Sequence, residues 1–417
     1  MRKNKEQGTK NKEQKSNTFD FLIVGAGFSG LVAAERLCAL GKRCLVVEKR
    51  DHIGGNAYDC YDSHGVLIHP YGPHYFRTNS GKILKYLSRF TEWIPGDYRV
   101  QVFREGRYWS FPINLKTFEQ YIGRSASPEE MQEWLESQKI PFARITNSEE
   151  AVLSQVGPSW YKMFFENYTL KQWKLHPREL SASVCQRIPV RTTRDDRYFN
   201  DKFQVLPKHG YHVLFENLVK ACGKNLEIRL NTDYKDIIAD PSISWQHMIF
   251  TGPIDTYFDY KFGPLPYRSL KFEHEHFSAE TLKKQRTKHK EQRTRNKEQR
   301  TKNEEPETKN HSFLQPCVQV NYPDPSVPYT RCVEAKHITG QKIEGTTLIK
   351  EYPEAYETTN EPYYPIPNAA SQKIYKQYEA EAKKLKNVSF IGRLGTYRYY
   401  NMDQVVGMAL SFVKKKI

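Results

Sequence analysis

Residues 19–30 read Phe19-Asp20-Phe21-Leu22-Ile23-Val24-Gly25-Ala26-Gly27-Phe28-Ser29-Gly30, and they decide the fold. The first half is a short apolar run typical of a buried parallel strand, and the second half is a Gly-x-Gly-x-x-Gly turn. The pattern that follows predicts a helix over residues 31–40 and a second strand over residues 43–47, directly before Glu48. Strand, glycine turn, helix, strand and acid in this order predict a Rossmann-like unit that binds a dinucleotide.

The glycine turn is suited to holding a pyrophosphate. Gly25 permits the tight turn, Gly27 lets the backbone approach the phosphates, and Gly30 lets the helix pack closely on the strand. The positive end of the helix faces the phosphates, and the acid at the end of the second strand can accept a hydrogen bond from a ribose hydroxyl. The cofactor-binding residues expected from this motif are Gly25, Gly27, Phe28, Ser29, Gly30 and Glu48.

The sequence favours FAD over NAD as the dinucleotide. Residues 49–56 contain Gly54-Gly55 and resemble the second glycine pair of FAD-dependent oxidoreductase-type folds, and no second Gly-x-Gly-x-x-Gly is present to seat a nicotinamide cofactor. Near the C-terminus we expect a last buried strand at 388–391 and a helix at 403–413 whose start points at the flavin edge or the pyrophosphate. These segments add Lys49, Gly55, Asn56, Gly392, Arg393, Met402 and Asp403 to the expected FAD-binding residues.

The chain length and cysteine content predict a multidomain enzyme of a reducing compartment. With 417 residues the chain exceeds one average domain. Its apolar runs are far shorter than the roughly 20 residues of a membrane span, and its basic N-terminus leads into no signal-peptide core. We therefore expect a soluble cytoplasmic protein. The seven cysteines form an odd set without a Cys-x-x-Cys pair, which indicates reduced thiols.

Much of the net charge of +16 lies in two stretches that repeat one polar heptad. Residues 1–17 hold 6 Lys and Arg against 2 Glu, and residues 281–311 hold 11 against 5. A coiled coil needs apolar residues in each heptad, and these heptads have none, so disorder is expected. The charge thus makes nucleic acid an unlikely partner of the folded part. A basic tether for nucleic acid or an anionic surface, around an inactive enzyme core, remains an alternative.

The whole pattern predicts an α/β fold: an FAD-binding Rossmann-like domain with an inserted helical domain and an antiparallel or mixed sheet domain. Helix starts are expected after Ser127 and Asn147, and strands within 199–267 and 318–352. The expected parts are a disordered basic tail at 1–17; a discontinuous FAD-binding domain at 18–92, 206–255 and 370–417; a helical domain at 99–180; a sheet or substrate domain at 181–205 and 256–369; and, within it, a disordered heptad insertion at 281–311.

Arginine, tyrosine and tryptophan are dense in the middle of the chain, which favours an anionic aromatic ligand. Guanidinium groups match phosphate oxygens, while aromatic rings offer flat surfaces for a base or a sugar. Solvated arginines and core tyrosines would give the same composition, so both interpretations stay open at this level.

Several longer strings resemble the UDP-galactopyranose mutase family. They follow the family's order from about residue 18 to the end, interrupted only by the heptad insertion. The strings are Ile68-His69-Pro70-Tyr71-Gly72-Pro73-His74-Tyr75-Phe76 and those at 166–173, 187–191, 198–204, 251–255, 257–260, 267–270, 327–331 and 392–394.

This resemblance implies an isomerase that interconverts UDP-galactopyranose and UDP-galactofuranose without net redox change. In the family's proposed mechanism, N5 of reduced FAD attacks the anomeric carbon, UDP leaves, the adduct opens to an iminium, and the ring closes through the other hydroxyl. The implied partners are the UDP-sugar, NAD(P)H or a reductase as reductant, and a second copy in a homodimer. An amine-oxidase-like flavin oxidoreductase is the alternative, because the N-terminal motifs are shared that widely.

The resemblance also implies roles for individual residues. His74 matches the histidine beside the flavin, and Arg187 and Arg331 match the arginines that hold the diphosphate; these three are the expected catalytic residues. Two positions depart from the family pattern: many members have His where this chain has Arg77, and some carry Asp where it has Asn401. The expected substrate-binding residues are Phe164, Tyr168 and Trp173 around the uridine, Tyr198, Tyr364 and Tyr399 around the diphosphate with Asn401 beside it, and Arg268 in a string that borders the site.

Overall fold

The computed structural model of the chain describes residues 17–284, 313–357, 359–366 and 368–416. The heptads expected to be disordered therefore lie outside the described residues, apart from their edges. No described helix has both the length and the hydropathy needed to cross a membrane. The seven cysteines, which belong to the described part, are all free.

A five-stranded parallel sheet forms around the glycine motif. Its order is β10-β2-β1-β11-β17, so β1 lies in the centre. The central strand is buried on both faces because Ile23 and Leu22 point into different cores. The strands are β1 (Thr18–Val24), β2 (Cys44–Val47), β10 (Leu226–Arg229), β11 (Ser244–Phe250) and β17 (Val388–Phe390).

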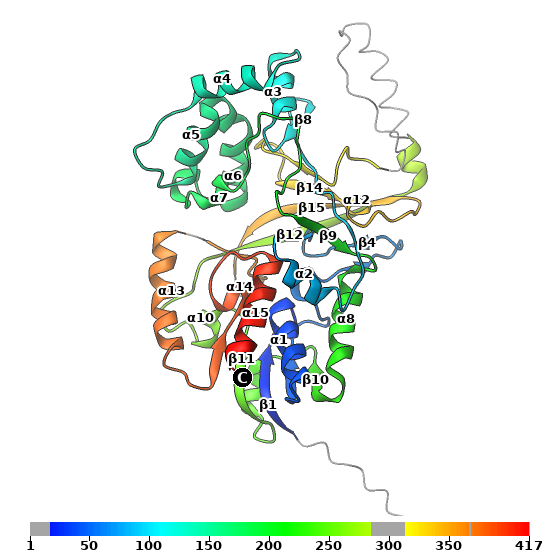
Figure 1. The fold of residues 1–417 in the computed structure, drawn as a ribbon, viewed down its shortest axis with the longest axis vertical. Helices are drawn as coiled ribbons and strands as arrows, with labels where there is room; N and C mark the ends of the chain where they lie inside the picture. Colours follow the sequence, from blue (N-terminus) through cyan, green and yellow to red (C-terminus); the bar gives the residue numbers. More distant parts are fainter. Residues whose placement is uncertain (1–16, 285–312, 358, 367, 417) are drawn as a thin grey trace, which may run out of the picture.

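Three long helices cover one face of this sheet. The helix α1 (Phe28–Ala39) contacts both α8 (Gly210–Cys222) and α15 (Met402–Lys416), and Figure 1 shows α1 and α15 side by side above β1. Apolar residues of the three helices share one core with the sheet, including Leu31, Leu214 and Val406. The helix α1 begins three residues before the predicted start, so the last half of the glycine motif is already helical.

A seven-stranded mixed sheet forms the second layer, in the order β16-β12-β15-β14-β13-β7-β8. All its pairs are antiparallel except β13 with β7. The strands β7 and β8 fall in the range predicted as helical domain, but β7 pairs with β13, far away in the sequence, and β8 joins the sheet by pairing with β7. The strands are β7 (Val100–Arg104), β8 (Arg107–Phe111), β12 (Tyr267–Phe277), β13 (Gln319–Asn321), β14 (Arg331–Glu334), β15 (Thr346–Ala355) and β16 (Tyr364–Pro365).

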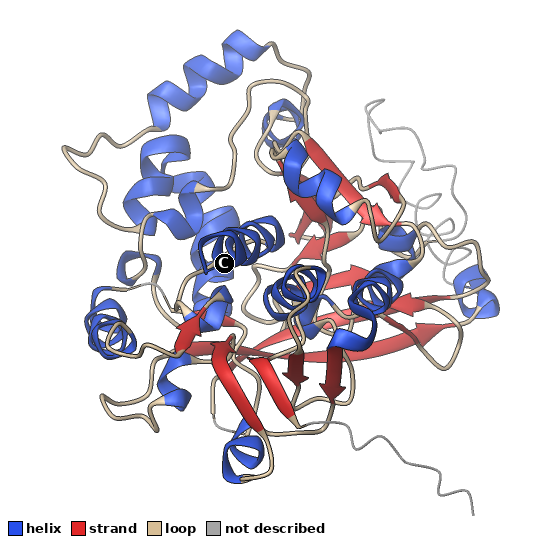
Figure 2. Ribbon diagram, turned by 60° about the horizontal axis from the view of Figure 1, so that its bottom comes forward, coloured by secondary structure: helices blue, strands red, loops and turns tan. Residues whose placement is uncertain are grey.

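A group of helices follows β8 and stands apart from the parallel sheet, as Figures 1 and 2 show. The predicted caps are present: Ser127 accepts a hydrogen bond from the Glu130 amide, and Asn147 from the Glu150 amide. The helical path kinks at Gly157, which has φ +72°. The elements are α3 (Leu115–Ile122), α4 (Pro128–Gln138), α5 (Ser148–Trp160), a π-helical turn (Tyr161–Phe165), α6 (Glu166–Trp173) and α7 (Ser183–Gln186).

Short elements connect these layers. Two small antiparallel sheets have the orders β3-β4 and β5-β9-β6. Their strands are β3 (Cys60–Tyr61), β4 (Leu67–Ile68), β5 (Phe76–Thr78), β6 (Trp93–Pro95) and β9 (Phe203–Pro207). The remaining helices are α2 (Gly81–Leu87), α9 (Tyr234–Ala239), α10 (Ile254–Tyr257), α12 (Ala335–Thr339), α13 (Ala369–Ala382), α14 (Gly392–Gly395) and the 3₁₀ turns Gly55–Ala57, Pro177–Glu179 and Gly223–Asn225.

Candidate active site

The glycine turn between β1 and α1 packs so closely against neighbouring atoms that side chains do not fit at two of its positions. Gly25 has φ +100°, and a Cβ placed there would lie 2.2 Å from Thr251 Oγ1. A Cβ on Gly30 would lie 1.9 Å from the Gly25 carbonyl oxygen. Only glycine therefore fits at both positions, as the motif predicted.

The Glu48 carboxylate fastens this turn to the end of β2. One oxygen accepts a hydrogen bond from the Ala26 amide at 2.8 Å, and the other accepts one from the Arg50 amide at 3.1 Å. A carboxylate has about four acceptor positions, so Glu48 keeps capacity for a ribose hydroxyl while it shapes the turn.

A cavity of about 440 Å³ opens in front of the turn. The start of α1 and the start of α15 both border it, so two helix N-termini offer partial positive charge to an anion. Among the predicted cofactor residues, Gly30, Gly392 and Asp403 lie outside its lining. The predicted residues that line it are Gly25, Gly27, Phe28, Ser29, Glu48, Lys49, Gly55, Asn56, His74, Arg393, Asn401 and Met402.

Part of the lining of this cavity carries no sequence signal. Glu361 forms ion pairs with Lys49 and with Arg50, each at 2.8 Å, and so joins a late loop to the glycine-rich side. Nothing near Glu361 in the sequence resembles a nucleotide motif. The other lining segments missed are Thr232, Asp233, Tyr234, Lys235, Thr256, Tyr260, Tyr356, Asn360 and Pro362. The glycine turn, the two helix N-termini and the extent of this cavity fit a dinucleotide.

His74 lines the same cavity as a neutral acceptor. Its Nδ1 lies 2.7 Å from the Gly72 carbonyl oxygen, which can only accept, so Nδ1 carries the proton and Nε2 keeps a lone pair. Burial, with help from His69 and Arg393, lowers the pKa of His74 to about 3. The His74 backbone amide also donates to His69 Nδ1 at 3.1 Å, which fixes the loop.

A second, narrower cavity of about 80 Å³ lies between the helical group and the seven-stranded sheet. It brings together eight of the predicted site residues, and adds residues without a sequence signal of their own, such as Asn321. The predicted residues that line it are Phe164, Tyr168, Trp173, Arg187, Tyr198, Arg331, Tyr364 and Tyr399. The others are Phe111, Phe165, Thr169, Gln172, Val184, Cys185, Ile188 and Asn321.

Arg331 is held in this cavity by a buried carboxylate. Its Nε donates to Glu351 Oε2 at 2.7 Å, and the Glu351 side chain is 1% exposed. Burial would lower the pKa of the Arg331 guanidinium, but Glu351 raises it above its usual value. Because Nε is engaged, the terminal nitrogens of Arg331 are left to face a phosphate.

Tyr399 and Arg393 connect the two cavities. The guanidinium of Arg187 lies 4.9 Å from the Tyr399 ring centroid and that of Arg393 lies 5.1 Å from it. Tyr399 also stacks on Tyr364 at 5.4 Å between ring centroids. Tyr399 and Tyr364 line the narrow cavity whereas Arg393 and His74 line the wide one. The aromatic, cationic cavity therefore adjoins the dinucleotide cavity.

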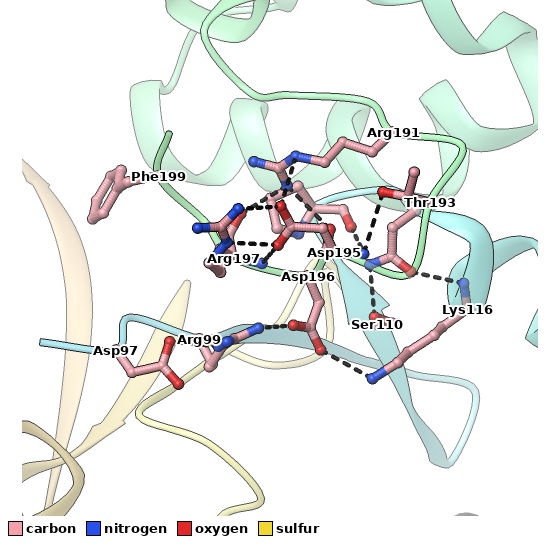
Figure 3. A network of polar contacts seen from close by, with 12 residues as sticks. Asp97, Arg99, Ser110, Lys116, Arg191, Thr193, Asp195, Asp196, Arg197 and Phe199 are labelled. Carbon is pink, nitrogen blue, oxygen red and sulfur yellow. Dashed lines mark hydrogen bonds and ion pairs between the residues drawn. The ribbon is translucent and has the colours of Figure 1, made fainter. Parts of the chain in front are cut away.

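The segment after Arg187 is tied to the sheet by polar contacts, which Figure 3 shows. Arg99 and Lys116 both form ion pairs with Asp196. The Arg191 guanidinium donates to two carbonyl oxygens of the same segment at 3.2 and 2.7 Å. These contacts hold the chain between Arg187 and Tyr198, two residues of the narrow cavity.

Arg268, expected at the border of the site, lies behind the narrow cavity. It is 4% exposed, and its Nε donates to the Gln172 carbonyl oxygen at 3.2 Å. A cation at the C-terminal end of α6 stabilises that helix, so the contact supports the cavity wall from outside.

Arg77 and Asn401, the two departures from the family pattern, contact each other. An Arg77 terminal nitrogen donates to Asn401 Oδ1 at 2.8 Å, and the other pairs with Asp201 at 2.7 Å. The guanidinium also lies 4.2 Å from the ring centroid of Phe199. Arg77 thus fixes the side chain of Asn401, which lines the wide cavity.

Comparisons with known proteins agree with this geometry. A family profile described as UDP-galactopyranose mutase matches residues 163–309 and 292–399, and one described as NAD(P)-binding Rossmann-like domain matches residues 23–90. A probable UDP-galactopyranose mutase of Klebsiella pneumoniae is 34% identical over 397 residues, which cover 94% of each chain. The chain belongs to the UDP-galactopyranose mutase family. It is therefore an enzyme of the isomerase class, as predicted.

A second relative and a solved structure extend these comparisons. A dTDP-fucopyranose mutase of Escherichia coli is 34% identical over 395 residues, covering 93% of this chain and 96% of that protein. A crystal structure of reduced UDP-galactopyranose mutase has a TM-score of 0.71 at 16% identity, covering 95% and 93% of the two chains. The predicted fold class is confirmed, and a flavin is the cofactor that the Rossmann-like domain and the family support.

Proposed function

We propose that the chain interconverts UDP-galactopyranose and UDP-galactofuranose with FAD bound in its reduced state, without net redox change. The contact of the two cavities at Arg393 and Tyr399 carries this proposal. A dinucleotide cavity that adjoins an aromatic cavity with two guanidinium groups suits a cofactor acting on a nucleoside diphosphate sugar.

The narrow cavity offers each part of such a substrate a matching partner. Phe164, Tyr168 and Trp173 provide rings for the uracil and the ribose. Arg187 and Arg331 hold the diphosphate and stabilise the charge that grows on its oxygen as the bond to the sugar breaks. They also keep UDP in place for its return, so the sugar stays protected from water.

A reduced flavin supplies a nucleophile for the anomeric carbon of the sugar. The chain's part is to orient the sugar at the junction of the cavities, where His74 presents a neutral accepting nitrogen. A neutral acceptor suits a donor group on the edge of a reduced cofactor and adds no charge that would compete with the diphosphate. NAD(P)H or a reductase as reductant, a cytoplasmic location and a homodimer belong to the same proposal.

The test is conversion of UDP-galactofuranose by the purified full-length chain, followed by chromatography. Dithionite-reduced enzyme is expected to form UDP-galactopyranose, and oxidised enzyme is expected to be inactive. Heat release of the cofactor should yield FAD. Equal conversion by both redox forms would contradict the proposal.

The same assay distinguishes the competing functions. A dTDP-fucopyranose substrate is included because a dTDP-fucopyranose mutase is equally similar to this chain. If the enzyme prefers this substrate, the proposed isomerase reaction stands, but the nucleotide and the sugar of the natural substrate differ from those proposed. Net oxidation of an amine by oxygen, without conversion of either nucleotide sugar, would support an oxidoreductase instead.

A further inference from the structure

Lys171 on α6 reaches out of the helical group into a loop of the seven-stranded sheet. Its Nζ donates to the carbonyl oxygens of Tyr322, Asp324 and Tyr329 at 2.6, 3.0 and 2.8 Å. An ammonium group has three N–H donors and no acceptor, so these carbonyls use its whole capacity. Burial lowers the pKa of Lys171 to about 8, because the group has been removed from water.

The loop that accepts these bonds holds two residues of the narrow cavity at its ends. Tyr322 directly follows Asn321, and Tyr329 lies two positions before Arg331. Both Asn321 and Arg331 line the cavity. The loop is closed on itself, since the Tyr322 amide donates to the Thr330 carbonyl oxygen at 2.8 Å. A displacement of the loop would therefore move both lining residues together.

The helix that carries Lys171 forms the opposite wall. Tyr168 and Trp173 flank Lys171 on α6 and line the cavity, whereas Lys171 itself does not. A second cationic side chain joins the sheet to the helical group from the other side of their interface. Arg104 of β7 donates to the carbonyl oxygens of Lys162 and Met163 at 2.9 and 2.6 Å. The two walls are thus joined by a reciprocal pair of cation-to-carbonyl contacts.

We propose that Lys171 is a positioning residue for the substrate. It fixes the aromatic wall on α6 at the correct distance from the wall with Asn321 and Arg331. The proposal rests on the proposed function, since it takes a uridine diphosphate compound to be the ligand between these walls. Loss of the contact widens the cavity and weakens binding, while the groups at the flavin junction keep their places.

The experiment measures UDP binding to the full-length flavin-loaded protein by calorimetry. Lys171→Met removes the donors and is expected to raise the Kd for UDP about tenfold, the equivalent of one charge-assisted hydrogen bond. Lys171→Arg keeps the charge, but a planar fork cannot direct three donors from one nitrogen to three carbonyls, so we expect a rise of about threefold. Lys174→Met is the matched control: it removes an exposed lysine after the same helix and should leave the Kd unchanged.

Turnover separates positioning from a general structural role. In Lys171→Met, KM should rise about tenfold while kcat changes less than about twofold. A Kd for UDP equal to wild type in the methionine variant overturns the proposal. If that variant does not fold, an unchanged Kd in Lys171→Arg overturns it. Failure of the proposed function would differ, because the wild-type protein would then bind no UDP, and both ideas would fall.

Discussion

At the scale of single residues, two neighbouring arginines lower the pKa of the Tyr399 hydroxyl. The surrounding protein desolvates its hydroxyl, which favours the neutral phenol, but Arg187 and Arg393 outweigh this effect and lower the pKa to about 8. Tyrosine in an unfolded chain has a pKa near 10. Between these values the folded state binds fewer protons, so this contribution to stability is present above about pH 10 and is lost as the pH falls through 8.

Direct titration tests this pKa. The difference in tyrosinate absorbance between wild type and Tyr399→Phe should have its midpoint near pH 8. Saturating UDP should move the midpoint upward, because the negative diphosphate disfavours a second anion beside it. A midpoint above 10 without UDP would show that the two arginines do not outweigh the desolvation of this hydroxyl.

Arg331 and Glu351 provide a second test at this scale. Arg331→Met leaves a buried carboxylate uncompensated, which should lower the free energy of unfolding by about 3 kcal/mol. It should also weaken UDP binding by roughly 10-fold to 100-fold, since charge-assisted bonds to phosphate are lost. Denaturant unfolding and calorimetry measure the two effects.

The double variant Arg331→Met/Glu351→Gln separates the two roles of this pair. Removing the buried charge should restore most of the stability but none of the UDP affinity. Recovery of the affinity would mean that Arg331 acts only through the fold.

At the scale of elements, the sequence predicted where helices start but not which strands pair with each other. The caps at Ser127 and Asn147 act within three residues of the chain, so the sequence predicted both helix starts. The strands β7 and β8 joined the mixed sheet, although their range was predicted as helical domain. Their placement depends on the pairing of β7 with β13, where Val100 lies opposite Gln319, and no local pattern encodes such a contact.

The crossing of β1 and α1 gives a prediction at the element scale. Gly30→Ala forces a methyl group to within 1.9 Å of the Gly25 carbonyl oxygen, so the helix must move away from the strand. We expect the purified variant to lose most of its flavin, measured by absorbance relative to protein. Gly81→Ala at the start of α2 is the control, because nothing lies within 4 Å of the added atom. Full flavin content in Gly30→Ala would contradict the close packing.

At the scale of the whole molecule, the two cavities draw on all layers of the fold. The parallel sheet supplies the dinucleotide cradle, the helical group supplies Phe164, Tyr168 and Trp173, and the mixed sheet supplies Asn321 and Arg331. Neither residues 278–284 nor residues 313–318, on the two sides of the heptad stretch, line either cavity. The heptads are therefore expected to be separable from the site.

Replacing residues 285–312 with a short Gly-Ser linker tests this separation. The segment holds 9 Lys and Arg against 5 Glu, so the net charge should fall from +16 to +12. Flavin content and the Kd for UDP should remain unchanged. Weaker retention on an immobilised polyanion, with unchanged turnover, would assign a tethering role to the segment. A loss of turnover would show that the segment supports the site.

The sequence by itself determined the Rossmann-like cradle and the family, and through the family resemblance it indicated eight of the residues that line the narrow cavity. The cradle follows from a short string whose steric demands are local, such as glycine where a Cβ cannot fit. Only the tertiary structure decided that Glu361 closes the wide cavity, that Glu351 holds Arg331, that Arg268 lies behind the site and that Lys171 joins its two walls. These contacts are long-range and involve common residue types, so they exist only once the layers have packed together.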